Sequence, residues 1–231
     1  MLQTTQLIGF GSGLEQGPYE AFWSGYNVNN SAITNSANLD IGREYIDRIV
    51  FVGVSYYNTD SVSSVTVNGQ TANFVGRLAI TTTMAWYACI APPGSGLVNV
   101  SATFASSRAS VIGVYVLKGG AGLNPIFDVA TGYQNNSNSA LGYFSSAAPL
   151  NDLVFCLGNK ALSNAFAGFN SNMTPITNNI NYVAYTNAGF GFGFVGPNTT
   201  ARAAGAAYIQ GTGADSSKPT AFCAIKVSKT E

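Results

Sequence analysis

The stretch from Val62 to Lys118 alternates between β-strand patterns and turn signals, with no helical pattern between them. Polar and apolar residues alternate over Ser64–Asn68, and Asn68-Gly69 is a strong hairpin signal because both residues tolerate a positive φ. Leu97–Phe104 has one apolar and one polar face, which predicts a strand with one face in water. Val111–Leu117 is apolar on both faces, which predicts a central strand. This stretch therefore predicts antiparallel β-sheets.

The same patterns continue on both sides of that stretch. Further strands are predicted over residues 46–57, 85–90, 127–132, 141–145, 153–157, 165–169, 178–185, 189–196, 203–210 and 221–227. No segment has a convincing helical stripe, and no repeat of fixed period is visible. The sequence therefore predicts an all-β fold, an antiparallel β-sandwich of jelly-roll or Ig-like order with roughly a dozen strands.

Residues 1–36 have a different character, with several glycines and a group of large apolar side chains. Tyr19, Phe22 and Trp23 could not be buried by an isolated segment, so they should dock on the domain or on a neighbouring subunit. We therefore expect an extended N-terminal assembly arm over 1–36 and one β-sandwich domain over 37–231. The GFGSG run within the arm lacks the strand and helix of a nucleotide-binding loop.

The composition restricts the function classes. Charged residues make up only 9% of the chain and the net charge is zero, whereas about a quarter of an average soluble protein is charged. The ten Lys and Arg residues form no basic cluster, so nucleic-acid binding is not predicted. A surface so poor in charge has little repulsion between copies, which favours a homo-oligomer or a larger assembly. A secreted binding module could have the same composition.

Catalytic chemistry is not predicted. The chain has no histidine, which removes the usual general base and the commonest zinc ligand. Asp40, Glu44 and Asp47 lie among Arg43 and Arg48, and local salt bridges explain them better than a pair of catalytic carboxylates. The remaining Asp residues lie beside turns, where Asp caps backbone donors. We expect no enzyme activity, no cofactor and no metal site.

The three cysteines, Cys89, Cys156 and Cys223, each lie inside a strand-like run. Their spacing fits neither a metal knuckle nor a small disulfide scaffold. Buried, reduced thiols are the simplest interpretation. The alternative is one disulfide, within or between subunits, with an odd cysteine.

The first residues contain neither the basic region nor the apolar run of a signal peptide. No segment approaches the ~20 consecutive apolar residues of a membrane span. We therefore expect a protein that is made in a cytoplasm, without membrane insertion, and that stays there until it is assembled or released by lysis.

Several of these runs, in their order along the chain, carry a resemblance to a known class of proteins. The pieces are DRIVFVGVSY, SVSSVTVNGQTANFVG, MAWYACIAPPGSGLVNVSATF, VIGVYVLKG, DLVFCLG and AFCAIKV. Their series resembles a β-sandwich of structural proteins in tailed-phage virions and of some bacterial surface proteins. The resemblance implies a structural subunit on the virion exterior, either a capsid decoration or stabilising protein or a tail or fibre component. Its partners would be copies of itself and other virion proteins.

Carbohydrate binding in adhesion or host adsorption is the alternative function, with a host-surface glycan as the partner. Aromatic side chains that stack on sugar rings would carry it, although most aromatic residues serve in packing. Tyr56 and Tyr57 are adjacent, so one of the two must face away from the core. The aromatic residues considered for glycan or partner contact are Trp23, Tyr56, Tyr57, Trp86, Tyr133 and Tyr143.

Overall fold

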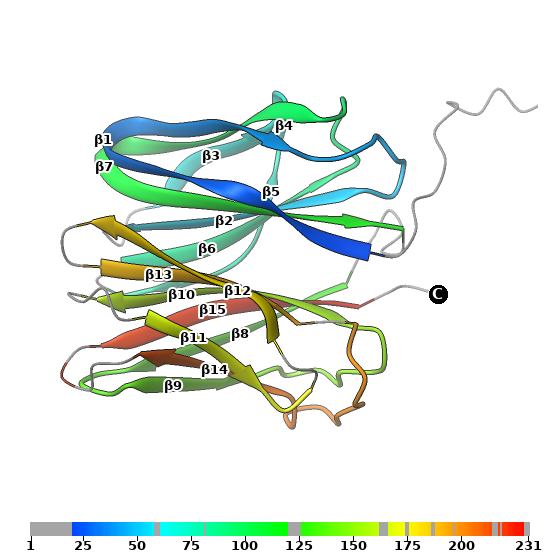
Figure 1. Cartoon of the computed structure of the whole chain (residues 1–231), viewed down its shortest axis with the longest axis vertical. Helices are drawn as coiled ribbons and strands as arrows, with labels where there is room; N and C mark the ends of the chain where they lie inside the picture. The colour runs from blue at the N-terminus through cyan, green and yellow to red at the C-terminus, as the bar shows by residue number, and fades with distance from the viewer. Residues whose placement is uncertain are drawn as a thin grey trace, which may run out of the picture.

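The computed structural model of the chain describes residues 20–57, 61–80, 82–119, 126–161, 166–173, 176–185, 188–195, 197–213, 217 and 219–228. Every regular element in these ranges is a β-strand, and every strand pair is antiparallel. The strands form a stack of sheets (Figure 1). The predicted all-β sandwich architecture is therefore confirmed.

The described strands form two successive sandwich units, whereas a single sandwich was expected over 37–231. Unit 1 covers residues 20–118 and holds β1 (Glu20–Asp40), β2 (Ile49–Tyr57), β3 (Val62–Val67), β4 (Gln70–Thr71), β5 (Asn73–Ala79), β6 (Thr82–Ile90) and β7 (Leu97–Lys118). Unit 2 covers residues 126–228. It holds β8 (Ile126–Gln134), β9 (Ser139–Tyr143), β10 (Leu153–Ala161), β11 (Phe166–Ser171), β12 (Ile176–Tyr185), β13 (Ala188–Val195), β14 (Tyr208–Gly213) and β15 (Thr220–Ser228).

Both units have the same strand order. The larger sheet runs β5-β6-β2-β7-β1 in unit 1 and β12-β13-β10-β15-β8 in unit 2, and the smaller sheets run β3-β7-β1 and β11-β14-β9. In unit 1 the long strands β1 and β7 each pass through both sheets. In unit 2 two shorter strands take the place of each long one: β8 and β9 in place of β1, and β14 and β15 in place of β7. The first and last strands of each unit are neighbours in its larger sheet. This order is that of a jelly-roll.

The register repeats as well as the order. In unit 1, Gly53 of β2 pairs with Trp86 on one side and Gly113 on the other. In unit 2, Leu157 of β10 pairs with Phe192 and Cys223 in the same way. The chain is thus a structural tandem repeat, although its sequence shows no fixed period.

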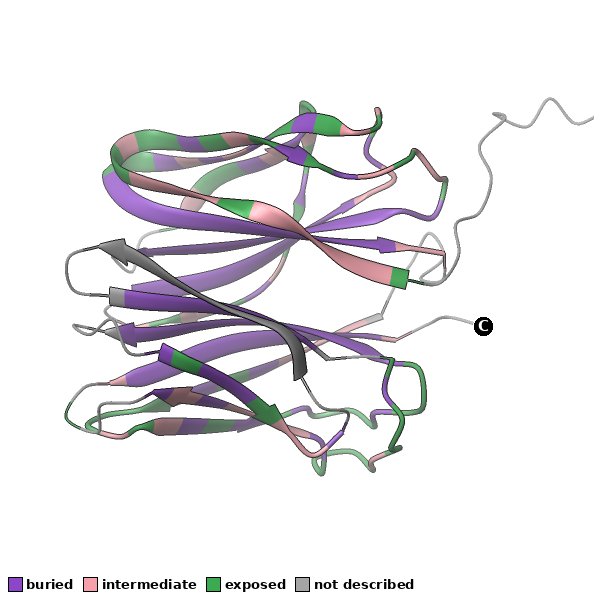
Figure 2. Ribbon diagram, viewed as in Figure 1, coloured by how far each residue is buried: buried purple, intermediate pink, exposed green. Residues whose placement is uncertain are grey.

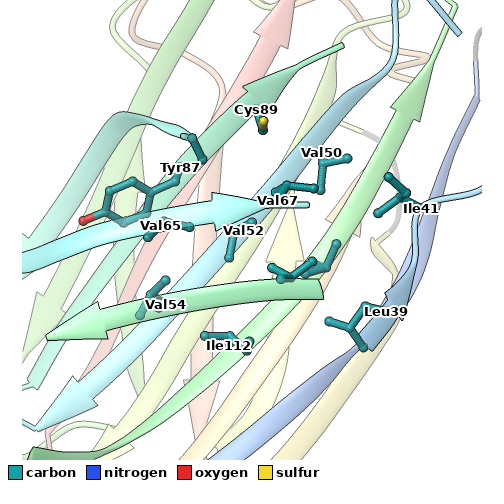
Figure 3. Packing of buried hydrophobic residues seen from close by; sticks show 14 of the residues in the cluster. Leu39, Ile41, Val50, Val52, Val54, Val65, Val67, Tyr87, Cys89 and Ile112 are labelled. Atoms are coloured by element: carbon teal, nitrogen blue, oxygen red, sulfur yellow. The ribbon is translucent and has the colours of Figure 1, made fainter. Parts of the chain in front are cut away.

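Each unit has its own core between its two sheets. In unit 1 the core side chains are mostly valines and other aliphatic residues, among them Val50, Val52 and Val54 of β2 (Figure 3). In unit 2 the core is built around Phe144, Phe166, Phe169 and Phe222.

A third core joins the two units, because their larger sheets pack face to face. The strands in the middle of the stack are consequently buried on both faces, while the outer strands are partly exposed (Figure 2). The sequence of a central strand that is covered on both sides is a nearly continuous apolar run. This explains the two apolar faces of the 111–117 run.

Aromatic rings fill the core between the units. Phe192 lies over the paired residues Gly53 and Gly113: a Cβ atom on Gly113 would stand 2.4 Å from the Phe192 ring. The ring centroids of Trp23 and Phe192 are 5.1 Å apart. From the opposite side, Trp86 donates its indole N–H to the Cys223 carbonyl oxygen at 3.0 Å.

The contacts between the units are reciprocal. β5 lies against β8, and its counterpart β12 lies against β1; β6 lies against β15, and β13 reaches β7 through Phe192 and Gly113. Each contact thus recurs with the roles of the units exchanged. This is the pattern of an isologous, two-fold interface between identical subunits, here formed within one chain.

Three expected boundaries need correction. The described part of the expected arm, residues 20–36, lies in β1 and pairs with β7 from Glu20↔Lys118 onward, because its apolar residues are buried best within the sheet. Leu97–Lys118 is one continuous strand, not two. The strand expected over 203–210 starts at Tyr208, and the chain turns at residues 204–206; Gly205 there has a φ of 71°.

The hollow at Gly113 gives a test of the packing between the units. We expect Gly113→Ala to lower the free energy of unfolding by about 1–3 kcal/mol, because the added methyl group overpacks a filled core. Gly211→Ala is the matched control, since a Cβ atom there would stand 3.3 Å from its nearest neighbour, on Phe222. Chemical denaturation of both variants provides the measurement. Equal stability of the two variants would contradict the packing described here.

Candidate functional site

A groove opens in unit 1 where β3 and β5 diverge. β4 still pairs with β3 in the smaller sheet, through Thr66↔Thr71 and Val67↔Gln70. After Ala72 the chain crosses to the larger sheet, where β5 pairs with β6. The space between the diverging strands has a volume of about 470 Å³ and is lined by residues 61–65, residues 71–74, Tyr56, Arg77, Ala85 and Tyr87. This space is called the β3–β5 groove below.

Three aromatic residues line the β3–β5 groove at different depths. Tyr56 is 1% exposed and belongs to the core of unit 1. Tyr87 belongs to the same core and is labelled in Figure 3. Phe74 is 56% exposed, and its ring meets the Tyr87 ring edge-on, with centroids 5.7 Å apart. The groove therefore has aromatic walls and an aromatic rim.

Polar groups complete the lining. The polar lining residues are Ser61, Ser63, Ser64, Thr71 and Asn73. Burial raises the pKa of Tyr87 to about 12, Tyr56 raises it as well, and the Arg77 cation acts in the opposite direction. The Tyr87 hydroxyl is therefore protonated at neutral pH and can both donate and accept a hydrogen bond.

The structure separates the tyrosines that the sequence singled out. Tyr56 is buried and its ring packs against Phe104, while the Arg108 guanidinium lies 5.4 Å from the ring centroid. Tyr57 is 64% exposed. Tyr133 and Tyr143 are also exposed, on β8 and β9 of unit 2. These four tyrosines do not form one site.

The arm residues are placed as follows. Tyr19 lies outside the described residues. Phe22 is half-buried against the core of unit 1, where the Lys118 ammonium lies 4.9 Å from its ring centroid. Trp23 packs against the core between the units, 4.8 Å from the Tyr115 ring. Phe22 and Trp23 therefore contact their own chain.

The residues that line the rim of the groove were missed by sequence reasoning. Phe74 and Arg77 follow the predicted hairpin, but nothing in their local pattern marks them as a site. Their position depends on the β4–β5 segment crossing between sheets, which is a tertiary feature. Trp86, which was considered for glycan contact, is fully buried in the core between the units.

The carboxylates of Asp128 and Asp152 both make structural contacts. Asp128 accepts hydrogen bonds from Val129, Ser145 and Ser146; burial raises its pKa, but these hydrogen bonds outweigh burial and hold the pKa below its usual value. Asp152 forms a buried ion pair with Lys226 at 3.1 Å. Burial raises the pKa of Asp152, and the hydrogen bonds from Lys226 and Ser228 oppose that shift.

Arg48 has a role different from the local salt bridging expected for it. Its buried guanidinium donates to the backbone carbonyls of Ile41, Gly42, Arg43, Pro92 and Gly94. It therefore fastens the loop before β2 to the loop after β6. Burial lowers the pKa of Arg48 from its usual value, while Glu44 raises it.

No group of three or more metal-ligating side chains occurs within the described ranges. The same part of the chain has no helix of the length and hydropathy needed to cross a membrane. The absence of catalysis, cofactors and metals remains a prediction.

No family model matches the chain, and a search of curated proteins finds no significant match.

All three cysteines are free and buried. Burial raises the pKa of Cys89 to about 11 and that of Cys223 to about 12, and it raises the pKa of Cys156 well above the usual value. Since the thiolate is the reactive form, each thiol is both shielded and protonated near neutral pH. The expected buried thiols are confirmed.

These thiols give a direct test of the core assignments. At pH 8 we expect a thiol-specific reagent to modify none of the three cysteines in the native protein and all three after denaturation. Mass spectrometry counts the labels. A cysteine that reacts in the native protein as fast as in the denatured protein would show that its strand is placed wrongly.

Proposed function

We propose that this protein is a structural subunit on the exterior of a tailed-phage virion, as a capsid decoration or stabilising protein or a tail or fibre component. It acts through protein–protein contacts with copies of itself and with other virion proteins. The observation that carries this proposal is the uncharged outer face of unit 2.

That face is formed by β9, β11 and β14, whose sequences SALGY, FAGFNS and YIQGTG contain no charged residue. Side chains alternate between the two faces of a strand, and Ala140, Phe169 and Ile209 face the core of unit 2. The opposite face presents a patch of apolar and neutral polar groups to solvent. We call this patch the outer face of unit 2: Leu141, Tyr143, Asn170, Tyr208, Gln210 and Thr212.

The aromatic part of this face is ordered by its own contacts. Tyr143 pairs with Tyr208 across β9 and β14, and the two rings meet edge-on with centroids 6.2 Å apart. Leu141 and Tyr143 are both about half exposed. Tyrosine is enriched in interfaces, where its ring is buried and its hydroxyl finds a partner.

Some of the few charges of the chain are withdrawn from the surface. Ten acidic and ten basic residues are present in the sequence, and six of these are buried: Asp47, Arg48, Arg108, Asp152, Lys160 and Lys226. Lys160, for example, donates to the Ser137 carbonyl at 2.7 Å and to the Thr220 hydroxyl at 2.8 Å. Little electrostatic repulsion therefore opposes contact between copies.

The resemblance to virion β-sandwiches gives the proposal its biological setting. A decoration, tail or fibre subunit is made in the host cytoplasm and then binds an assembling particle. An uncharged face on a rigid sheet is suited to such contacts, because it loses little polar solvation on burial.

A charge placed on the outer face of unit 2 tests the proposal. We expect Leu141→Lys with Tyr143→Lys to reduce incorporation into density-banded particles by at least about tenfold, because two unpaired cations would be desolvated in the contact. Quantitative mass spectrometry of the particles gives the copy number relative to the major shell protein.

Asn99→Lys is the matched control, since it adds a cation to an exposed position of β7, on the outer side of unit 1. This variant should be incorporated like the natural chain. Absence of the natural chain from particles would refute the virion role. Equal incorporation of all variants would refute the assignment of the contact to unit 2.

A further inference from the structure

We propose that the β3–β5 groove binds a saccharide that carries a carboxylate group, such as a uronic or sialic acid residue. This inference goes beyond the assembly role and does not rest on it, because the groove lies in unit 1 and the proposed assembly face lies in unit 2. It is argued from the shape of the groove, its aromatic rim, its charge and the irregular edges of its walls.

The first step is the aromatic rim. Phe74 is more than half exposed, yet the Tyr87 ring holds it edge-on from within the groove. An exposed ring in a fixed position offers its face to the apolar C–H face of a sugar ring at low cost in conformational entropy. An exposed aromatic residue at the mouth of a cavity is also stronger evidence for a binding site than a single exposed aromatic residue on a flat surface.

The second step is hydrogen bonding. The polar residues Ser63, Ser64, Thr71 and Asn73 line the groove together with Phe74, and side-chain and backbone groups of such residues can form hydrogen bonds. Small-molecule sites combine apolar surface with a few polar groups that set orientation. The groove volume of about 470 Å³ falls within the usual range of about 300–1,000 Å³ for such sites. A ligand with many hydroxyl groups matches this lining.

The third step is charge. Arg77 is the one charged residue among the described groove-lining residues, and none of them is an Asp or Glu. Arg77 pairs with Ala85 across β5 and β6, as Phe74 pairs with Tyr87, and all four residues line the groove. A guanidinium can bind a carboxylate with two parallel hydrogen bonds. The groove is therefore complementary to an anionic sugar, and a cationic ligand is disfavoured.

The fourth step distinguishes a saccharide from an extended peptide. A peptide strand would need a regular backbone edge to pair with. The pairing of β3 is irregular between Val62 and Ser64, and that of β5 is irregular between Phe74 and Gly76. Bulges of this kind disturb the ladder and protect edges from strand addition. The walls of the groove thus favour a ligand that is recognised by side chains.

Isothermal titration of the full-length chain with defined sugars tests the proposal. The acidic probes are 3′-sialyllactose and tri-galacturonic acid, and lactose is the neutral probe. We expect at least one acidic probe to bind more tightly than lactose. Arg77→Gln should weaken that binding by about tenfold, because it removes a hydrogen bond between charged groups, and should leave any lactose binding unchanged.

Phe74→Ala should weaken the binding of the acidic probe by about fivefold or more through the loss of stacking. Tyr57→Ala is the control, because it removes an exposed tyrosine that does not line the groove. Thermal denaturation shows whether each variant is folded, and Arg77→Gln is the milder change because Arg77 is exposed.

The outcomes are separable. The two acidic probes distinguish a sialic acid from a uronic acid as the source of the carboxylate. Absence of binding to both acidic probes, or acidic binding that Arg77→Gln does not alter, would overturn the proposal. Binding of a strand-forming peptide to the groove would overturn it as well. None of these results bears on incorporation into particles, so the assembly role is tested independently.

Discussion

The packing of the two larger sheets against each other is the constraint on which the rest of the structure depends. Phe192 can lie over β2 and β7 because Gly53 and Gly113 pair there and leave no Cβ atoms in its way. Trp86 fills the reciprocal position and donates its N–H to the Cys223 carbonyl. Two large rings are thus buried by two different means, a glycine hollow on one side and a hydrogen bond on the other. A jelly-roll unit alone would leave these aromatic surfaces in water, where they would promote aggregation.

This arrangement decides which surfaces remain for function. The larger sheets are occupied by each other, so the smaller sheets form the two outer faces of the stack. In unit 2 the outer face carries no charge and supports the proposed assembly contact. In unit 1 the β4–β5 segment crosses from the smaller to the larger sheet and opens the β3–β5 groove. The same repeated topology thereby provides two different surfaces, because the side chains and strand edges differ between the units.

Local features of the fold could be read from the sequence, and long-range ones could not. The Asn68-Gly69 turn has the predicted positive φ values of 48° and 81°, and Phe190, Phe192 and Phe194 share one buried face as their spacing predicts. The pairing of β1 with β7 joins Glu20 to Lys118, and no local pattern indicates so distant a partner. For the same reason Phe22 and Trp23 were expected in an arm. Of the candidate site, Tyr56 was identified, whereas Phe74 and Arg77 depend on the crossing of β5 between sheets.

Native-state hydrogen exchange tests the central claim, that the two units form one body around a shared core. If the claim is correct, amides of β2, β10, β15 and the part of β7 that pairs with β2 (residues 110–117) exchange only through global unfolding, and they share one opening free energy. Amides of the outer strands β3, β9 and β14 should exchange through smaller openings. If the strands of unit 1 and unit 2 instead show two separate opening free energies, with the inner sheet of one unit exchanging while the other stays protected, the units are independent and the claim is wrong.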